Sequence, residues 1–252
     1  MARFPFALLI LSASVTIVRA QTAPPSLADA TTRLERAALA DDVEGIKRSR
    51  TDLLRILSAA SAADAPAVRY AVAYADWRQS TNPVVPVKEQ DALLDEAELQ
   101  LKDLIKAQPQ SAEALALMSS VYGIKIAHSP MKGMFLGSKS SNAIDSAMKI
   151  DPGNPRVLIS KAVGKFNAPG MFGGSEKEAE SLLRKAIDVL AGQPADKAFP
   201  AWGRFDAHAW LGQVLAKRGD KDGARAEYAK ALEVAPQSGW VRYVLIPALD
   251  KR

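Results

Sequence analysis

Hydrophobic residues recur at steps of three and four along most of the chain, and polar residues fill the positions between them. This spacing puts one apolar stripe on each segment, which predicts amphipathic α-helices rather than strands. Prolines and glycines interrupt the pattern repeatedly, and each interruption predicts the end of one helix or the start of the next. The predicted fold class is therefore all-α, with helices that pack in antiparallel pairs.

The most regular stretch runs from Asp206 to Pro236 and predicts two helices joined at Gly219 and Asp220. Small residues are needed where two helix backbones approach closely, and larger residues fill the gaps between them. The positions that mark this pair are Leu211, Gly212, Leu215, Ala224, Tyr228, Ala231 and Leu232. Their order and spacing resemble a tetratricopeptide (TPR) repeat. The resemblance implies an α-α superhelix, a right-handed solenoid of stacked hairpins that builds a binding surface.

Earlier segments of the chain fit the same template less closely. Residues 87–107 resemble the second helix of a repeat, and two further units begin near Ala112 and at Pro155. The resemblance therefore covers residues 65–252. Residues 238–248 predict the capping helix that a repeat array needs at its open end.

Two of these units carry an insertion between their helices, at residues 129–138 and 168–175. Each insertion contains the motif G-M-F-x-G-S, and because the turns of stacked repeats fall along one edge, we expect the two insertions to be neighbours. The glycines permit tight turns, and the apolar side chains of the motif either pack against the next repeat or contact a partner. The candidate contact residues are Met134, Phe135, Met171 and Phe172.

Phosphate binding is a third interpretation of the glycine-rich insertions. It is disfavoured because neither insertion has the order G-x4-G-K-[ST] and neither follows a predicted strand. The second insertion, together with the acidic start of the helix that follows it, also resembles a subset of bacterial exported TPR proteins to which no biochemical role is assigned.

A second candidate surface is the inner groove, which in TPR arrays is lined mainly by first helices. The template places Ile159, Val163 and Phe166 in this groove. Small and apolar groove positions suit an amphipathic helix or an extended peptide. The lysine and asparagine pattern with which some TPR domains hold acidic chaperone tails is missing from the aligned positions, so that role is not expected.

Residues 1–20 have the features of a secretory signal peptide, with a positive start at Arg3, an apolar run and a small residue, Ala20, at the cleavage site. The apolar run is shorter than the ~20 residues that span a bilayer, although an uncleaved anchor stays an alternative. No later segment predicts a membrane helix. Residues 21–26 predict a mobile polar leader, and residues 27–64 predict an N-terminal helical segment of one helix or two. The predicted localisation is periplasmic or secreted.

Charge and cysteine content narrow the possible functions. The 252 residues carry a formal charge of +5, and Arg3 and Arg19 contribute two of the positive charges within the predicted signal peptide. The remaining charges of both signs are interspersed, which indicates a solvated surface rather than a nucleic-acid interface. The chain has no cysteine, which excludes disulfides, thiolate metal sites and a cysteine nucleophile.

Histidine supplies no catalytic or metal-binding pattern. His128 and His208 are the two histidines, and neither lies in an H-x3-H or H-E-x2-H sequence. His208 occupies a first-helix position, where we expect a packed, hydrogen-bonded imidazole. No serine lies in G-x-S-x-G, and the paired carboxylates lie on polar faces or at helix starts. We therefore predict no enzyme activity, no metal and no cofactor.

The sequence favours a non-enzymatic exported scaffold that binds a protein or peptide partner in the cell envelope through its groove and inter-helix loops. The alternative is an adaptor or solute-handling accessory of a periplasmic transport system, which an enclosed apolar pocket would favour. The identity of the partner and the oligomeric state stay open.

Overall fold

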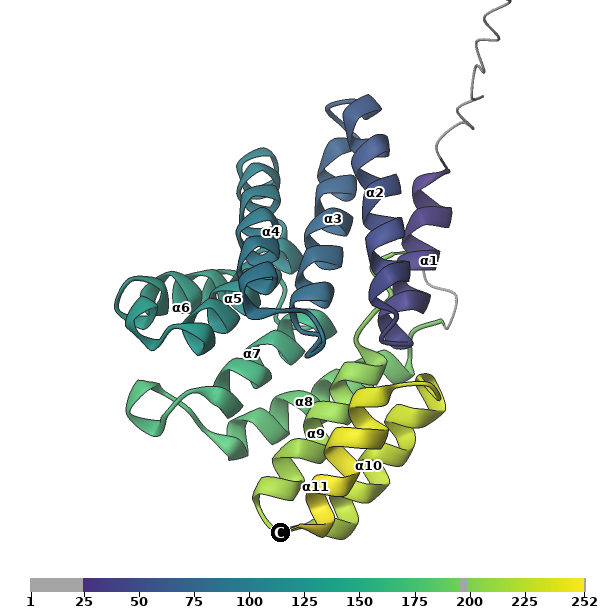
Figure 1. Cartoon of the computed structure of the whole chain (residues 1–252). Helices are drawn as coiled ribbons and strands as arrows, with labels where there is room; N and C mark the ends of the chain where they lie inside the picture. Colours follow the sequence, from purple (N-terminus) through teal and green to yellow (C-terminus); the bar gives the residue numbers. More distant parts are fainter. Residues whose placement is uncertain (1–24, 195–198, 252) are drawn as a thin grey trace, which may run out of the picture.

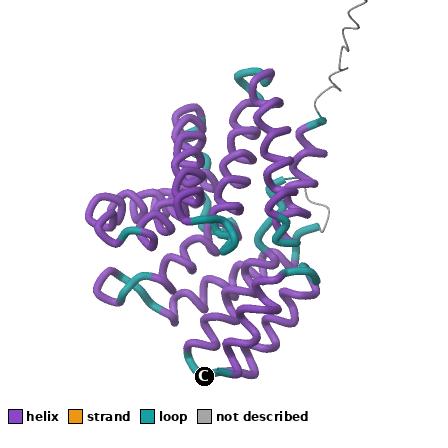
Figure 2. Tube along the Cα trace, in the orientation of Figure 1, coloured by secondary structure: helices purple, strands orange, loops and turns teal. Residues whose placement is uncertain are grey.

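The computed structural model describes residues 25–194 and 199–251, and within these residues every regular element is a helix (Figures 1 and 2). The predicted all-α fold class is therefore confirmed. The predicted signal peptide, residues 1–20, lies outside the described residues. Among the helices that are described, none is both long enough and apolar enough to cross a membrane.

The α-helices are α1 (Leu27–Leu39), α2 (Val43–Ala59), α3 (Ala65–Ser80), α4 (Val87–Ala107), α5 (Ala112–His128), α6 (Gly133–Ile150), α7 (Pro155–Asn167), α8 (Glu176–Ala191), α9 (Arg204–Lys217), α10 (Lys221–Val234) and α11 (Ile246–Asp250).

Consecutive helices pack as hairpins, as the pattern of prolines and glycines predicts. Helix α3 packs on α4, α5 on α6, α7 on α8, and α9 on α10, and Figure 1 shows these pairs following one another along a curve. The backbones of α9 and α10 come close, because a Cβ atom added to Gly212 would lie 2.3 Å from the ring of Tyr228. Gly212 therefore occupies a position where a small residue is required.

The N-terminal segment is two helices rather than one. Asp42 caps α2, because its carboxylate accepts a hydrogen bond from the N–H of Gly45 at 2.9 Å. Asp41, just before this cap, has a φ angle of +54°. Aspartate tolerates this left-handed conformation better than most residues, so the chain can turn sharply between α1 and α2.

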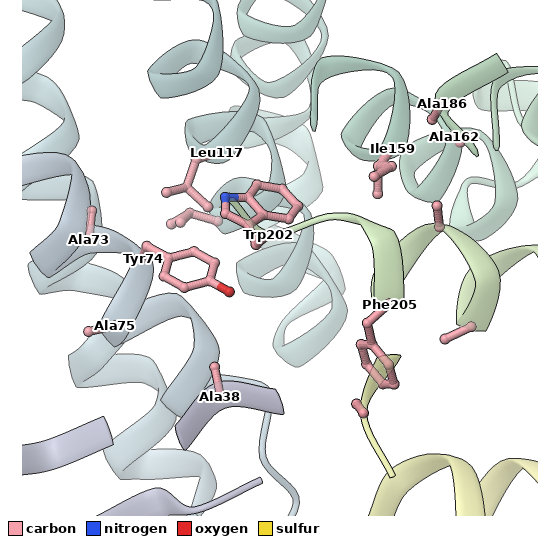
Figure 3. Close-up of a cluster of buried hydrophobic side chains, with 14 of the residues drawn as sticks. Ala38, Ala73, Tyr74, Ala75, Leu117, Ile159, Ala162, Ala186, Trp202 and Phe205 are labelled. Atoms are coloured by element: carbon pink, nitrogen blue, oxygen red, sulfur yellow. The ribbon is translucent and has the colours of Figure 1, made fainter. Parts of the chain in front are cut away.

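The segment that precedes α9 inserts Trp202 among helices that are distant in sequence. Trp202 stacks on Tyr74 of α3 with ring centroids 5.7 Å apart, and its indole N–H donates to the hydroxyl of Tyr70 at 3.1 Å. Figure 3 shows Trp202 beside Tyr74 of α3 and Leu117 of α5. Buried aromatic pairs add a specific ring-to-ring attraction to the burial of apolar area. The irregular segment is therefore part of the hydrophobic core.

A buried polar network holds the same segment in place. The guanidinium of Arg156, which is 1% exposed, pairs with Glu113 of α5 at 2.8 Å and donates to the carbonyl of Trp202 at 3.0 Å. The carboxylate of Glu35 in α1 accepts from the N–H of Ala201 at 2.8 Å, and burial raises the pKa of Glu35 despite that bond. Because breaking a buried ion pair costs about 3–5 kcal/mol, these groups fix the segment against α1, α5 and α7.

The first and last parts of the described chain meet (Figure 1). The Asp41 carboxylate accepts hydrogen bonds from the N–H groups of Gly239 at 2.8 Å and Trp240 at 3.2 Å, so it caps the C-terminal helix. Nearby, Arg78 of α3 pairs with Asp206 of α9 at 2.8 Å, and both side chains are largely buried. The N-terminal helices therefore close onto the C-terminal hairpin.

The helix that the sequence predicts at residues 238–248, as a cap of the array, is present as Trp240–Leu245 and α11 (Ile246–Asp250). Trp240–Leu245 form a π-helix that continues into α11. Pro247 has no N–H to donate to the preceding turn, which accounts for the local departure from α-helical hydrogen bonding. Val241 and Leu249 are buried, so this helix covers apolar surface of the preceding hairpin.

Replacing Asp41 with glycine removes the carboxylate that caps the C-terminal helix but keeps a residue that tolerates a φ angle of +54°. We expect the free energy of unfolding to fall by about 1–2 kcal/mol, the usual contribution of an N-cap. Urea unfolding followed by circular dichroism measures this. Asp41→Asn is the matched control, since it keeps an acceptor oxygen and should lose less. Equal stability of Asp41→Gly and the parent chain would show that this cap contributes nothing.

Candidate binding site

Five large apolar side chains are exposed at the turns of two hairpins. They have exposed fractions from 72% to 84% and are Met131, Met134, Phe135, Met171 and Phe172. We call these five residues the apolar edge. Side chains this exposed make few contacts with the protein, so the interpretation in which the Met and Phe residues of the motif pack against the next repeat is wrong.

Both insertions lie between the two helices of a hairpin, as predicted. The first follows α5 and begins with the 3-10 turn η1 (Pro130–Lys132), and the second follows α7 and contains the 3-10 turn η2 (Gly170–Phe172). Helix α5 packs on α7, so the two hairpins are neighbours, and both turns project to the left in Figure 1. The apolar edge is therefore shared between adjacent hairpins.

The two copies of the motif fold differently. In the first copy, residues 133–138 form the first turns of α6 rather than the turn that the sequence predicts. In the second copy, η2 is followed by Gly173 with a φ angle of +85°. The first copy has Leu136 at this position, and leucine is disfavoured in the left-handed conformation but suited to a helix. This single difference accounts for a helix in one copy and a turn in the other.

Gly174 is required by the second turn. A Cβ atom added to Gly174 would lie 1.8 Å from the carbonyl oxygen of Ala168, so no larger residue fits. The next residue, Ser175, caps α8 by accepting a hydrogen bond from the N–H of Glu178 at 3.2 Å. The equivalent glycine of the first copy, Gly137, lies in α6, and an added Cβ would meet nothing within 4 Å.

A cleft of about 490 Å³ lies between α4, α5 and α6. Met118 and Tyr122, one turn apart on α5, form its floor, and Ile105 of α4 and Ala143 of α6 form apolar walls. Helices α4 and α6 each pack on α5, which leaves a trough between them. Burial raises the pKa of Tyr122, and the charge of Glu98 adds to the rise. The Tyr122 phenol is therefore neutral at physiological pH.

Three exposed lysines stand at the rim of the cleft, Lys102 and Lys106 on α4 and Lys139 on α6. Lys102 is paired with Glu98 at 2.6 Å, whereas in the described part of the chain no carboxylate lies within ion-pair distance of Lys106 or Lys139. The cleft thus combines an apolar floor with two uncompensated positive charges. The sequence pattern does not single out these lysines, and its one signal is the four-residue spacing of Lys102 and Lys106 on a predicted helix.

Helix α6 connects the cleft to the apolar edge. Phe135 and Lys139 are four residues apart and so share one face of α6, and Lys139 lines the cleft. Phe135 therefore lies one turn beyond the cleft on the same face. Met134 directly precedes Phe135 and therefore points about 100° away from it around the axis of α6. That side of α6 carries Asp145, which pairs with Lys161 of α7 at 3.5 Å, so Met134 lies toward the second hairpin.

The groove candidates differ in their accessibility. Ile159 is 3% exposed, and its Cδ1 would lie 3.2 Å from a Cβ atom added to Gly203. Ile159 is thus a core residue that a partner cannot reach in this conformation. Val163 and Phe166 are half-buried, and the ammonium of Lys217 lies 4.9 Å from the ring centre of Phe166. A groove contact stays a prediction for Val163 and Phe166.

The histidines make local hydrogen bonds. His208 Nδ1 lies 2.6 Å from Glu227, which is the packed, hydrogen-bonded role that the sequence predicts. Burial opposes the ionisation of Glu227, but Lys230 and His208 together lower its pKa. His128 Nδ1 lies 2.9 Å from Asp91. Within residues 25–194 and 199–251, no group of three or more His, Asp or Glu side chains is placed to hold a metal ion.

No protein-family model matches the chain, and no curated protein matches it. Among solved structures, the chain is similar to the HusA haemophore from Porphyromonas gingivalis, with 22% sequence identity and a TM-score of 0.61. The similarity covers 77% of this chain and 96% of the HusA chain. At this level of identity, the comparison shows a shared all-helical fold.

Alanine at the two equivalent glycines should have opposite effects. Gly174→Ala forces a Cβ atom against the Ala168 carbonyl, and we expect the free energy of unfolding to fall by about 1–3 kcal/mol or more. Gly137→Ala should raise it by about 0.5–1 kcal/mol, because alanine is favoured over glycine inside a helix. Urea unfolding measures both, and effects of the same sign would contradict the different folds of the two copies.

Proposed function

We propose that the protein is a non-enzymatic, exported binding protein, built as a TPR-type array, that docks a protein or peptide partner of the cell envelope on its apolar edge. The observation that carries this proposal is the exposure of Met134 and Phe135 at the start of α6 and of Met171 and Phe172 in the turn of the neighbouring hairpin. The signal peptide predicted at residues 1–20 supports export to the periplasm or beyond the cell.

The chemistry of the apolar edge suits a macromolecular partner. Large apolar groups exposed to water contribute about 25 cal/mol for each Å² that a partner covers. Methionine adapts its shape, phenylalanine supplies a rigid anchor, and both are enriched at protein interfaces. Single exposed apolar side chains are ordinary, but five at the same end of two adjacent hairpins form the kind of patch that marks interaction sites.

The order of contacts between hairpins supports the TPR-type architecture. The first helices of successive hairpins touch, α5 with α7 and α7 with α9, as the inner layer of a TPR superhelix does. Val163 and Phe166 lie on this layer, so a partner that reaches past the apolar edge would meet them next. Partner docking thus combines an edge contact with a groove contact.

Polar replacement of the two phenylalanines tests the edge. We expect Phe135→Ser/Phe172→Ser to reduce partner capture from envelope extract by at least about tenfold, because two interface anchors of this kind contribute about 1–2 kcal/mol each. Quantitative mass spectrometry of the captured proteins measures this. The matched control is Tyr243→Ser/Val244→Ser, which removes two exposed apolar side chains elsewhere. Equal capture by both double variants would contradict docking on the apolar edge.

A second candidate function is the binding of a small solute. The cleft between α4, α5 and α6 favours it, since clefts of this size accept small molecules. The fold shared with a haemophore makes haem the first solute to test. This candidate corresponds to the solute-handling alternative that the sequence leaves open.

Titration with haem, followed by its Soret absorbance, should show a saturable shift of the band. Ala143→Trp, which places an indole in the cleft, is the control and should abolish the shift. An unchanged Soret band with the parent chain would remove haem from the candidate solutes and would leave partner docking untouched.

A further inference from the structure

We propose that the cleft between α4, α5 and α6 selects small amphipathic anions, which carry an acidic group on an apolar body. The acidic group binds between Lys106 and Lys139, and the apolar body lies between Ile105 and Ala143, over the small exposed parts of Met118 and Tyr122. This inference rests on the second candidate function, solute binding, and is independent of partner docking on the apolar edge.

The floor of the cleft recognises the apolar part of the ligand. Met118 and Tyr122 lie one turn apart on α5 and expose only 4% and 6% of their surface, so the half-buried Ile105 and Ala143 supply most of the apolar contact. A thioether and an aromatic ring suit both aromatic and aliphatic bodies. The volume of about 490 Å³ lies in the range of about 300–1,000 Å³ that small-molecule sites occupy.

The rim of the cleft recognises the charge. Lys106 and Lys139 stand on opposite walls, and among the described residues no Asp or Glu lines the cleft. Two carboxylates of α4 lie close to the cleft lysines in sequence, and both are paired: Glu98 with Lys102 and Lys125, and Asp103 with Arg69 at 3.0 Å. The mouth of the cleft is therefore positive and attracts an anion.

Both halves of the site are needed for selection. An inorganic anion binds the lysines but makes no apolar contact with the floor. An uncharged apolar molecule makes the apolar contact but no ionic one. Phe135 lies one turn beyond Lys139 on the same face of α6 and is 72% exposed. A ligand with a longer body can therefore extend over Phe135, outside the cleft itself.

Two fluorescent probes separate the charge from the apolar contact. Anilinonaphthalene sulfonate carries one negative charge, and phenylnaphthylamine is the same ring system without the sulfonate. With the purified full chain, we expect saturable binding of the sulfonate at least about tenfold tighter than binding of the neutral probe. Lys106→Met/Lys139→Met should lower the affinity for the sulfonate by at least about tenfold and leave the affinity for the neutral probe unchanged.

Three further variants complete the experiment, and circular dichroism establishes that each is folded. Lys149→Met/Lys177→Met removes the same charge from exposed positions outside the cleft and should change neither affinity. Ala143→Trp fills the cleft and should abolish binding of both probes. Met171→Ser/Phe172→Ser alters the apolar edge on the second hairpin and should leave both affinities unchanged.

The possible failures are distinguishable. If Lys106→Met/Lys139→Met and Lys149→Met/Lys177→Met lost equal affinity for the sulfonate, the proposal would be overturned. The attraction would then come from the overall positive charge of the protein and not from the cleft. Equal affinity of the parent chain for both probes would overturn the selection of anions and retain solute binding. Binding that persists in Ala143→Trp would overturn the location, and no binding of either probe would overturn solute binding itself.

Discussion

The buried guanidinium of Arg156 is the constraint on which the rest of the fold depends. It joins Glu113 of α5 to the carbonyl of Trp202, and Trp202 in turn contacts Tyr70 and Tyr74 of α3. Because a buried charge that loses its partners is costly, the segment before α9 cannot leave its place without opening the core. Helices α3, α5 and α7 therefore hold one relative orientation. The floor of the cleft lies on α5, so its shape depends on the same network.

Local features of the chain are predictable from the sequence, and long-range contacts are not. Helix α4 has the predicted bounds of residues 87–107, and Gly212 lies against Tyr228 as the repeat pattern requires. Periodicity and turn chemistry specify such features within a few residues. The insertion of Trp202 among helices distant in sequence has no periodic signal. The burial of Ile159 could not be predicted for the same reason. The template assigns Ile159 to the groove, but Gly203, in the segment before α9, covers it.

The repeated motif shows how one residue outweighs a shared pattern. The sequence predicts a turn in both copies, but Leu136 continues a helix where Gly173 makes a left-handed turn. The exposure of Phe135 and Phe172 could not be predicted from the sequence. Phenylalanine is more often buried than exposed, and the motif is compatible with either packing or partner contact. The cleft could not be predicted from the sequence either. Its lysines come together only because α4 and α6 both pack on α5.

The contact of Asp41 with the C-terminal helix has a mechanical consequence. The hydrogen bonds of Asp41 and the ion pair between Arg78 and Asp206 join the N-terminal helices to the C-terminal hairpin, and moving these parts of the structure away from each other would break both. These contacts restrain the position of the N-terminal helices relative to the C-terminal hairpin. A binding surface carried by restrained helices loses less conformational entropy when a ligand binds.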